Sequence, residues 1–391
     1  MKWLALLVVL GTLGLGASSA HAQPRPLGKE ELDAMVGEQP PEVVLLTFGV
    51  GGRIFEKFGH AALCLDYRDA REPLCFNYGV TDFSDAGGMV WGFLRGKQKF
   101  WVDPEKWSDM IGFYEDEDRD IYEQILPLTP EQARAVELEL LTSLEEAHRY
   151  YHYDHFFNNC TTRLRDIIDH ATSGKLAAGS EVAYPLTFRE MGYRGLHGLP
   201  PLISAADFVI GRQADDTPTL WQAMFHPDVL RQRVQVAFGA VPRMIYKRQG
   251  PKFPVTGSTF RLQMLLLALV FAVPLLVATW RRRFQRVALV WATLYLTFWG
   301  VVIWGLVIVS SIKGIRWNEN VLVLMPLDIA LPLLSPERRR RYAQLRVAGL
   351  FLVSALCGVG LLHQPLWIPV LSALAPLSVI AFDQKIAPPR A

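Results

Sequence analysis

The sequence has almost no excess of charge of either sign. Lys and Arg together number 40 and Asp and Glu number 38, which leaves a formal net charge of +2. A balance this even says little about partners. The basic residues form no stripe of the kind that binds nucleic acid, so we expect no nucleic-acid partner. The chain also has no internal repeat and no low-complexity segment.

Cysteine is scarce, and none stands where an export signal is expected to end. Lys2, an apolar core from Trp3 to Gly16 and the small-residue motif at 20–22 are typical of a signal peptide over residues 1–22. An uncleaved anchor helix is the alternative, and in both cases the segment that follows is exported. Gln23 comes next instead of a cysteine, so we do not expect the chain to be a lipoprotein itself.

The four cysteines divide into a predicted pair and two single thiols. Cys64 and Cys75 lie on two short β-like runs joined by a polar turn, and the hairpin would place them opposite each other, so we predict a disulfide. Cys357 falls in an apolar membrane stretch. Cys160 is then an unpaired thiol in an oxidising compartment, where pairing is the rule. A thiol kept reduced there favours a catalytic interpretation.

The pattern of residues 23–255 predicts an α+β domain. Short apolar runs punctuated by glycine predict strands, and longer amphipathic runs predict helices, with Pro104 and Thr129 marking two helix starts. The expected strands are 42–48, 60–67, 75–78, 99–102 and 119–127, and the expected helices are 29–37, 87–94, 104–114, 129–147, 161–171 and several short ones between 187 and 238.

Residues 260–383 contain five apolar stretches and predict an all-α membrane domain of about five helices. The second stretch, 287–311, comfortably exceeds the roughly 20 residues that cross a bilayer, whereas the third, 321–334, is short and either crosses or re-enters. Arginines at 281–283 and 338–341 belong on the cytoplasmic side. We therefore expect a multi-pass protein of the inner (cytoplasmic) membrane whose N-terminal domain is extracytoplasmic.

Cys160 stands at the predicted start of a helix and is the candidate nucleophile. Only the thiolate is reactive, and a helix N-terminus lowers the pKa of a thiol. Asn158 or Asn159 is expected to cap this helix, and the N–H groups around Thr161 are expected to hold an oxyanion. The alternative is a cysteine buried as a small apolar side chain.

His60 is the candidate base for Cys160, although a lone histidine in a strand is usually structural. Imidazole titrates in the range needed to accept a thiol proton. A third group should orient the ring. Asn77 lies on the adjoining strand with matching face parity, and Glu56 stands four residues before His60. The sequence leaves both open.

The aromatic run before Cys160 contains His152, Asp154 and His155, which suggest a metal site together with the cysteine. Zinc requires four well-spaced ligands, or three and a water. Alternation along an aromatic strand accounts for the run equally well, so we predict neither a metal nor another cofactor.

Polar residues open the third apolar stretch. Asn318, Asn320 and Asp328 stand beside or inside the expected lipid region, where polar groups tend to be functional. A helix cap and an acid reaching toward the membrane surface explain them as well.

Three motifs in the N-terminal domain resemble a known family. The order of histidine first and cysteine second resembles circularly permuted papain-like (NlpC-type) folds. More narrowly, Phe-Gly-His at 58–60, Asn-Tyr-Gly at 77–79 and Asn-Asn-Cys-Thr-Thr-Arg at 158–163 resemble the periplasmic domain of the lipoprotein lyso-form N-acyltransferase family (Lnb). That family also carries membrane helices after an exported thiol domain.

The resemblance implies transfer of an acyl chain from the diacylglyceryl group of a bacterial lipoprotein onto its N-terminal amine, through a thioester on Cys160. A lipoprotein or phospholipid would be the acyl donor. The rival interpretations are a membrane-tethered cysteine hydrolase, acting on cell-wall amides or lipid esters with the same residues, and a non-catalytic scaffold.

Overall fold

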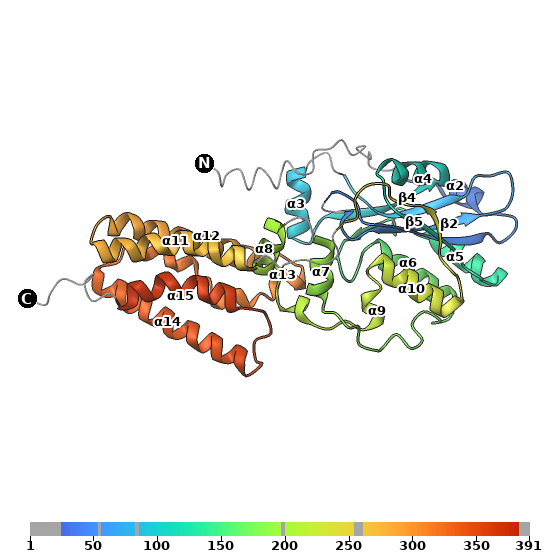
Figure 1. Ribbon diagram of the computed structural model, residues 1–391. Coiled ribbons are helices and arrows are strands. Elements are labelled where there is room, and N and C mark those ends of the chain that lie inside the picture. The colour runs from blue at the N-terminus through green and yellow to red at the C-terminus, as the bar shows by residue number, and fades with distance from the viewer. Residues whose placement is uncertain (1–24, 54–55, 83–85, 197–199, 254–260, 383–391) are drawn as a thin grey trace, which may run out of the picture. The chain divides into compact units, whose positions relative to one another are not determined.

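The computed structural model describes residues 25–53, 56–82, 86–196, 200–253 and 261–382 (Figure 1). The chain divides into two compact units. The first unit comprises residues 1–196 and 217–255, and the second comprises 197–216 and 256–391. The segment 197–216, which the sequence pattern placed in the N-terminal domain, therefore packs with the second unit.

The first unit is built on one antiparallel sheet of seven strands, in the order β6-β4-β3-β2-β1-β5-β7. Together with its helices, the sheet confirms the α+β class; the permuted papain-like arrangement stays a prediction. The strands are β1 (Glu42–Phe48), β2 (His60–Asp66), β3 (Leu74–Val80), β4 (Lys99–Lys106), β5 (Ile121–Ile125), β6 (Tyr150–His152) and β7 (Arg243–Tyr246).

Helices cover both faces of this sheet, which explains why β1 and β2 are apolar at nearly every position. Alternate residues such as Val43 and Leu63 belong to the cluster formed with α5, α6 and α10, and the intervening ones, such as Leu46 and Ala62, pack toward α4. Figure 1 shows α4 on one side of the sheet and α5, α6 and α10 on the other. The helices are α2 (Lys29–Met35), α3 (Ala86–Leu94), α4 (Trp107–Asp116), α5 (Pro130–Thr142), α6 (Cys160–Ala171), α7 (Phe188–Leu196), α9 (Leu220–Ala223) and α10 (Pro227–Phe238).

The helix start predicted at Pro104 is wrong. Pro104 lies in β4 opposite Phe76 of β3, and α4 begins only at Trp107. On its other side β4 pairs with β6 only through residues 99–101, so the missing N–H of Pro104 removes no bond of that ladder. The helix expected over 129–147 has the predicted Thr129 cap but ends at Thr142.

Cys64 and Cys75 face each other across β2 and β3 and form a disulfide. Among the described residues the free thiols are those of Cys160 and Cys357. Cys160 is therefore the free thiol of the first unit.

In its described residues the second unit contains four helices of 16 residues or more together with several short helical elements. Its elements are α8 (Pro200–Val209), η2 (Arg212–Asp215), α11 (Arg261–Arg281), α12 (Gln285–Val309), α13 (Lys313–Arg316), η3 (Glu319–Leu322), η4 (Pro326–Ala330), α14 (Pro336–Gly358) and α15 (Trp367–Phe382). Two helical stretches, 262–281 and 285–309, are long and apolar enough to cross a membrane. The number of crossings stays a prediction.

The third apolar stretch, 321–334, does not form a long helix. Its helical residues fall in the end of η3 and in η4, two short turns separated by residues 323–325. Its backbone approaches α12 so closely that a β-carbon on Gly300 would lie 2.7 Å from the Met325 carbonyl carbon. Side chains replace the helical hydrogen bonds: Trp304 donates to the Leu324 carbonyl and Arg346 to that of Val323. Buried backbone groups outside a regular helix need partners of this kind.

Candidate active site

Cys160 is the first residue of α6, and Asn159 caps that helix. The Asn159 side chain accepts a hydrogen bond from the Thr162 N–H at 2.9 Å, and the Thr162 hydroxyl accepts one from the Asn159 N–H at 2.8 Å. This reciprocal cap explains why the helix begins here. Because it occupies the N–H of Thr162, the N–H groups of Cys160 and Thr161 are the ones that the first turn can offer to an anion.

Asn158, the other candidate for the cap of this helix, makes different hydrogen bonds. Its amide donates to the His152 carbonyl at 2.7 Å and its carbonyl oxygen accepts from Arg163 Nε at 2.8 Å. Its backbone pairs with that of Asp154, so the chain folds back tightly just before Cys160. Asn158 therefore fixes the approach to Cys160.

The histidines and the aspartate of the aromatic run do not converge on a metal-like centre. The Asp154 side chain accepts from the N–H groups of Phe156 and Phe157. His155 is enclosed by aromatic rings, and burial together with nearby His226 lowers its pKa to about 4. Among the residues that the structure describes, no group of three His, Cys, Asp or Glu side chains is placed to hold a metal ion.

His60 is the first residue of β2, and Gly79 lies beside both this histidine and Cys160. Gly79 on β3 has a φ of +97°, and the β3–β4 register shifts between Tyr78 and Val80. A β-carbon on Gly79 would stand 3.8 Å from Cys160 Cβ and 3.9 Å from His60 Cε1. The irregular end of β3 therefore lies close to both Cys160 and His60.

Asn77 orients the His60 ring, and Glu105 orients Asn77. His60 Nε2 lies 2.8 Å from Asn77 Oδ1, and Asn77 Nδ2 donates to Glu105 Oε1 at 2.8 Å. A carboxylate only accepts, so the amide nitrogen of Asn77 must face Glu105 and its oxygen must face the ring. Nε2 therefore carries a proton, which leaves Nδ1 for the sulfur.

Glu56, the alternative orienting residue, does not bond to His60. Its carboxylate accepts from the backbone N–H and the guanidinium of Arg53. That ion pair fixes the loop that precedes β2.

The electrostatics of the pair favour the thiolate. Burial alone would raise the pKa of Cys160, but the charge and hydrogen bond of His60 outweigh it, with help from the Thr161 hydroxyl and the Ala61 N–H. Together they lower the pKa to about 7. Burial would lower the pKa of His60, yet the charge of Cys160 raises it above its ordinary value. The two groups stabilise each other as thiolate and imidazolium.

Sequence reasoning missed Glu105 because this residue fell inside the helix expected over 104–114. In β4 it lies opposite Cys75, diagonally across from Asn77.

The polar residues of the second unit have partners of their own. The Asn318 and Asn320 amides donate to the Phe208 carbonyl at 2.8 and 3.0 Å, which closes the C-terminal end of α8. Asp328 is fully buried and pairs with Arg346 at 3.0 Å and Tyr342 at 2.8 Å. These contacts favour the cap and ion-pair explanation.

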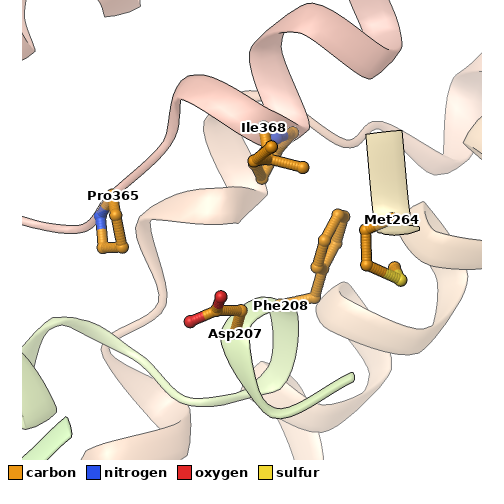
Figure 2. Close-up of a pocket in the computed structure, with 6 residues that line it drawn as sticks. Asp207, Phe208, Met264, Pro365 and Ile368 are labelled. Carbon is orange, nitrogen blue, oxygen red and sulfur yellow. The ribbon is translucent and has the colours of Figure 1, made fainter. Parts of the chain in front are cut away.

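A small pocket lies beside the end of α8 (Figure 2). It is lined by Asp207, Phe208, Met264, Pro365, Ile368 and Pro369, and its volume of about 10 Å³ has room for about one water molecule. An acyl chain does not fit in such a space.

A family comparison agrees with this geometry. Residues 31–193 match the model of the Lnb N-terminal periplasmic domain, a stretch that contains His60, Asn77 and Cys160. Comparison with curated proteins and with solved structures gave no match. The matched domain and the two long apolar helices describe a membrane protein with a periplasmic domain, of the type associated with lipoprotein modification. Residues 31–193 are therefore identified as a domain of the Lnb N-terminal periplasmic type.

Proposed function

We propose that this protein is a thiol acyltransferase that moves an acyl chain from the diacylglyceryl group of a lipoprotein to the amine of its N-terminal cysteine. The observation that carries the proposal is the free Cys160 thiol, whose pKa is lowered to about 7 by an imidazole that Asn77 orients. The Lnb domain match supports the substrate class.

In the first step the Cys160 sulfur attacks an ester carbonyl of the lipid. A carbon–sulfur bond forms, the carbonyl electrons move onto oxygen, and the N–H groups at the start of α6 stabilise that oxyanion. When the intermediate collapses, the carbon–oxygen ester bond breaks. The departing alkoxide takes the proton from His60, and the products are a lyso-lipid alcohol and a thioester on Cys160.

In the second step the amine of the lipoprotein's terminal cysteine attacks the thioester. The carbon–nitrogen bond forms as the carbon–sulfur bond breaks, and neutral His60 removes the proton that the amine must lose. An amide and the free thiolate result. The apolar helices of the second unit would tether the domain to the bilayer that carries both substrates, as a multi-pass protein of the inner membrane.

Mass spectrometry of the substrate tests this assignment. The full-length protein in detergent micelles is mixed with a diacylated lipopeptide, and we expect the lipopeptide mass to stay constant while one acyl chain moves from ester to amide. Cys160→Ser should abolish the rearrangement. His170→Ala is a matched control, because His170 lies at the far end of α6 and is exposed.

Each alternative predicts its own product. A loss of one acyl chain as free fatty acid, with no amide formed, would indicate a hydrolase and overturn the transferase. Rearrangement that continues in Cys160→Ser would exclude the thioester. No change of the lipopeptide in any variant would favour a non-catalytic scaffold.

A further inference from the structure

Tyr151 places a phenol group in the core of the first unit without a hydrogen-bond partner. It is the central residue of β6, opposite Phe100 of β4, and only 6% of the residue is exposed. Its ring packs near those of Tyr78 and Phe100. No described residue accepts or donates a hydrogen bond at its oxygen. Leaving a buried hydroxyl without a hydrogen bond is unfavourable and is uncommon in folded proteins.

Neighbouring Tyr78 shows that this core can provide a hydrogen-bond partner for a buried phenol. The Tyr78 hydroxyl donates to Ser143 Oγ at 2.7 Å. The two tyrosines belong to the same apolar cluster and are buried to a similar extent. The difference between them is where their oxygens lie.

The Tyr151 oxygen lies at the meeting point of nucleophile and base. A β-carbon on Gly79 would stand 3.8 Å from the Tyr151 oxygen, 3.8 Å from Cys160 Cβ and 3.9 Å from His60 Cε1. One point beside the glycine is therefore close to the thiol-bearing carbon, the imidazole and the phenol. An electrophile bound beside this point would be near the thiol, the imidazole and the phenol together, which is the arrangement expected of a stabilising donor.

We propose that Tyr151 is a catalytic residue whose phenol O–H donates a hydrogen bond to the oxyanion that forms when Cys160 attacks an ester. This role rests on the proposed acyl transfer and adds a side-chain donor to the N–H groups of α6. Attack forms the carbon–sulfur bond and moves the carbonyl electron pair onto oxygen. Tyr151 holds that oxygen until the ester oxygen departs with the proton of His60. The thioester carbonyl undergoes the same charge change when the amine attacks.

One feature keeps the proton on Tyr151, and a second strengthens its O–H as a donor. Burial, and then the negative charge of Cys160, raise the pKa of the phenol well above its ordinary value, so the proton stays on Tyr151. The Arg163 guanidinium lies 4.6 Å from the centre of the ring. Its charge draws electron density from the ring and strengthens the O–H as a donor.

The test compares two reactions of Cys160 in the full-length protein in detergent. p-Nitrophenyl butyrate acylates the thiolate through an oxyanion, whereas iodoacetamide alkylates it by direct displacement and forms none. For Tyr151→Phe we expect acylation to slow by about 100-fold, the effect of losing one oxyanion donor, with alkylation unchanged. Tyr78→Phe is the matched control, because it removes a buried phenol that already has an acceptor, and both reactions should keep their rates.

The outcomes separate this role from the proposed function. Equal acylation by Tyr151→Phe and the wild type, or a parallel decline of acylation and alkylation, would overturn the donor role. In another outcome, the ester acylates the wild type, and Tyr151→Phe more slowly, while the wild type leaves lipopeptides unchanged. That result would support the donor role of Tyr151 and refute lipoprotein acyl transfer. Wild-type protein that is alkylated but never acylated would overturn both.

Discussion

Removing the imidazole of His60 should raise the pKa of Cys160 and deplete its thiolate at neutral pH. With a pKa of about 7, half of the thiol is ionised at pH 7. The strongest influence that remains in His60→Ala is burial, which raises the pKa, so the value should reach at least the ordinary 9.0. The ionised fraction at pH 7 then falls to about 1%, a loss of about 50-fold.

The reaction rate should fall by less than the thiolate population. A thiolate of higher pKa is a stronger nucleophile, with a Brønsted coefficient of about 0.4–0.5. An increase of two pKa units therefore raises the reactivity of each thiolate by about 6- to 10-fold. The net decrease in alkylation at pH 7 is therefore about 5- to 8-fold. At high pH, where both proteins are fully ionised, the variant should react faster than the wild type.

The assay measures the rate of iodoacetamide alkylation against pH, with the modified protein quantified by intact mass. A Cys357→Ser background leaves Cys160 as the free thiol of the described chain. The midpoint should lie near pH 7 for the parent and at least two units higher for His60→Ala. A midpoint that stays near 7 in the variant would show that the helix N-terminus, and not His60, activates the thiol. Reactivity that is lost even at high pH would indicate misfolding instead.

Three further substitutions probe the surroundings. Glu105→Ala should slow alkylation of Cys160 at pH 7 by about 2- to 10-fold, the effect of losing one hydrogen bond. Glu105→Gln keeps an acceptor for the Asn77 amide, so its alkylation rate should stay near that of the wild type. Equal losses in both variants would refute the role of Glu105 in orienting Asn77 and His60. Gly79→Ala strains a φ of +97° and should lower stability by about 1–3 kcal/mol in thermal unfolding. Gly174→Ala has a similar φ of +85° and open space around it, so it should cost as much stability but leave the alkylation rate unchanged. Asp328→Ala should destabilise the protein in detergent by about 3–5 kcal/mol because it leaves the Arg346 charge buried and unpaired. Replacing both residues by leucine should cost less stability, which would confirm that reason.

Local signals in the sequence predicted much of the first unit. The strand over 42–48 agrees at both ends, because its apolar run is bounded by proline and glycine. The helix starts at Thr129 and at Asn159 are marked by side chains that cap them. Face parity placed Asn77 beside His60, because the hairpin fixes which residues of two neighbouring strands share a face.

Contacts between distant segments were beyond these signals. Proline is common at helix starts, and only the pairing of β4 with β3 shows why Pro104 fits a strand. Because of that error, Glu105 was assigned to a helix and was not recognised as a partner of Asn77. The segment 197–216 belongs with the second unit because Asn318 and Asn320, more than 100 residues later, hold the Phe208 carbonyl. Apolarity alone predicted a membrane stretch over 321–334, but Pro326 and the close approach to Gly300 exclude a continuous helix.

The position of Gly79 explains how residues from two faces of one sheet form a single centre. Cys160 comes from α6 and belongs to the core on that side, whereas the disulfide, Ala62 and Phe48 mark the other face of the sheet, where His60 stacks against the Phe48 ring. The positive φ of Gly79 and the register shift make the end of β3 irregular there, and a β-carbon at this position would be in ordinary van der Waals contact with both Cys160 and His60. The end of β3 therefore brings Asn77, which orients the His60 ring, close to Cys160 on the other side of the sheet.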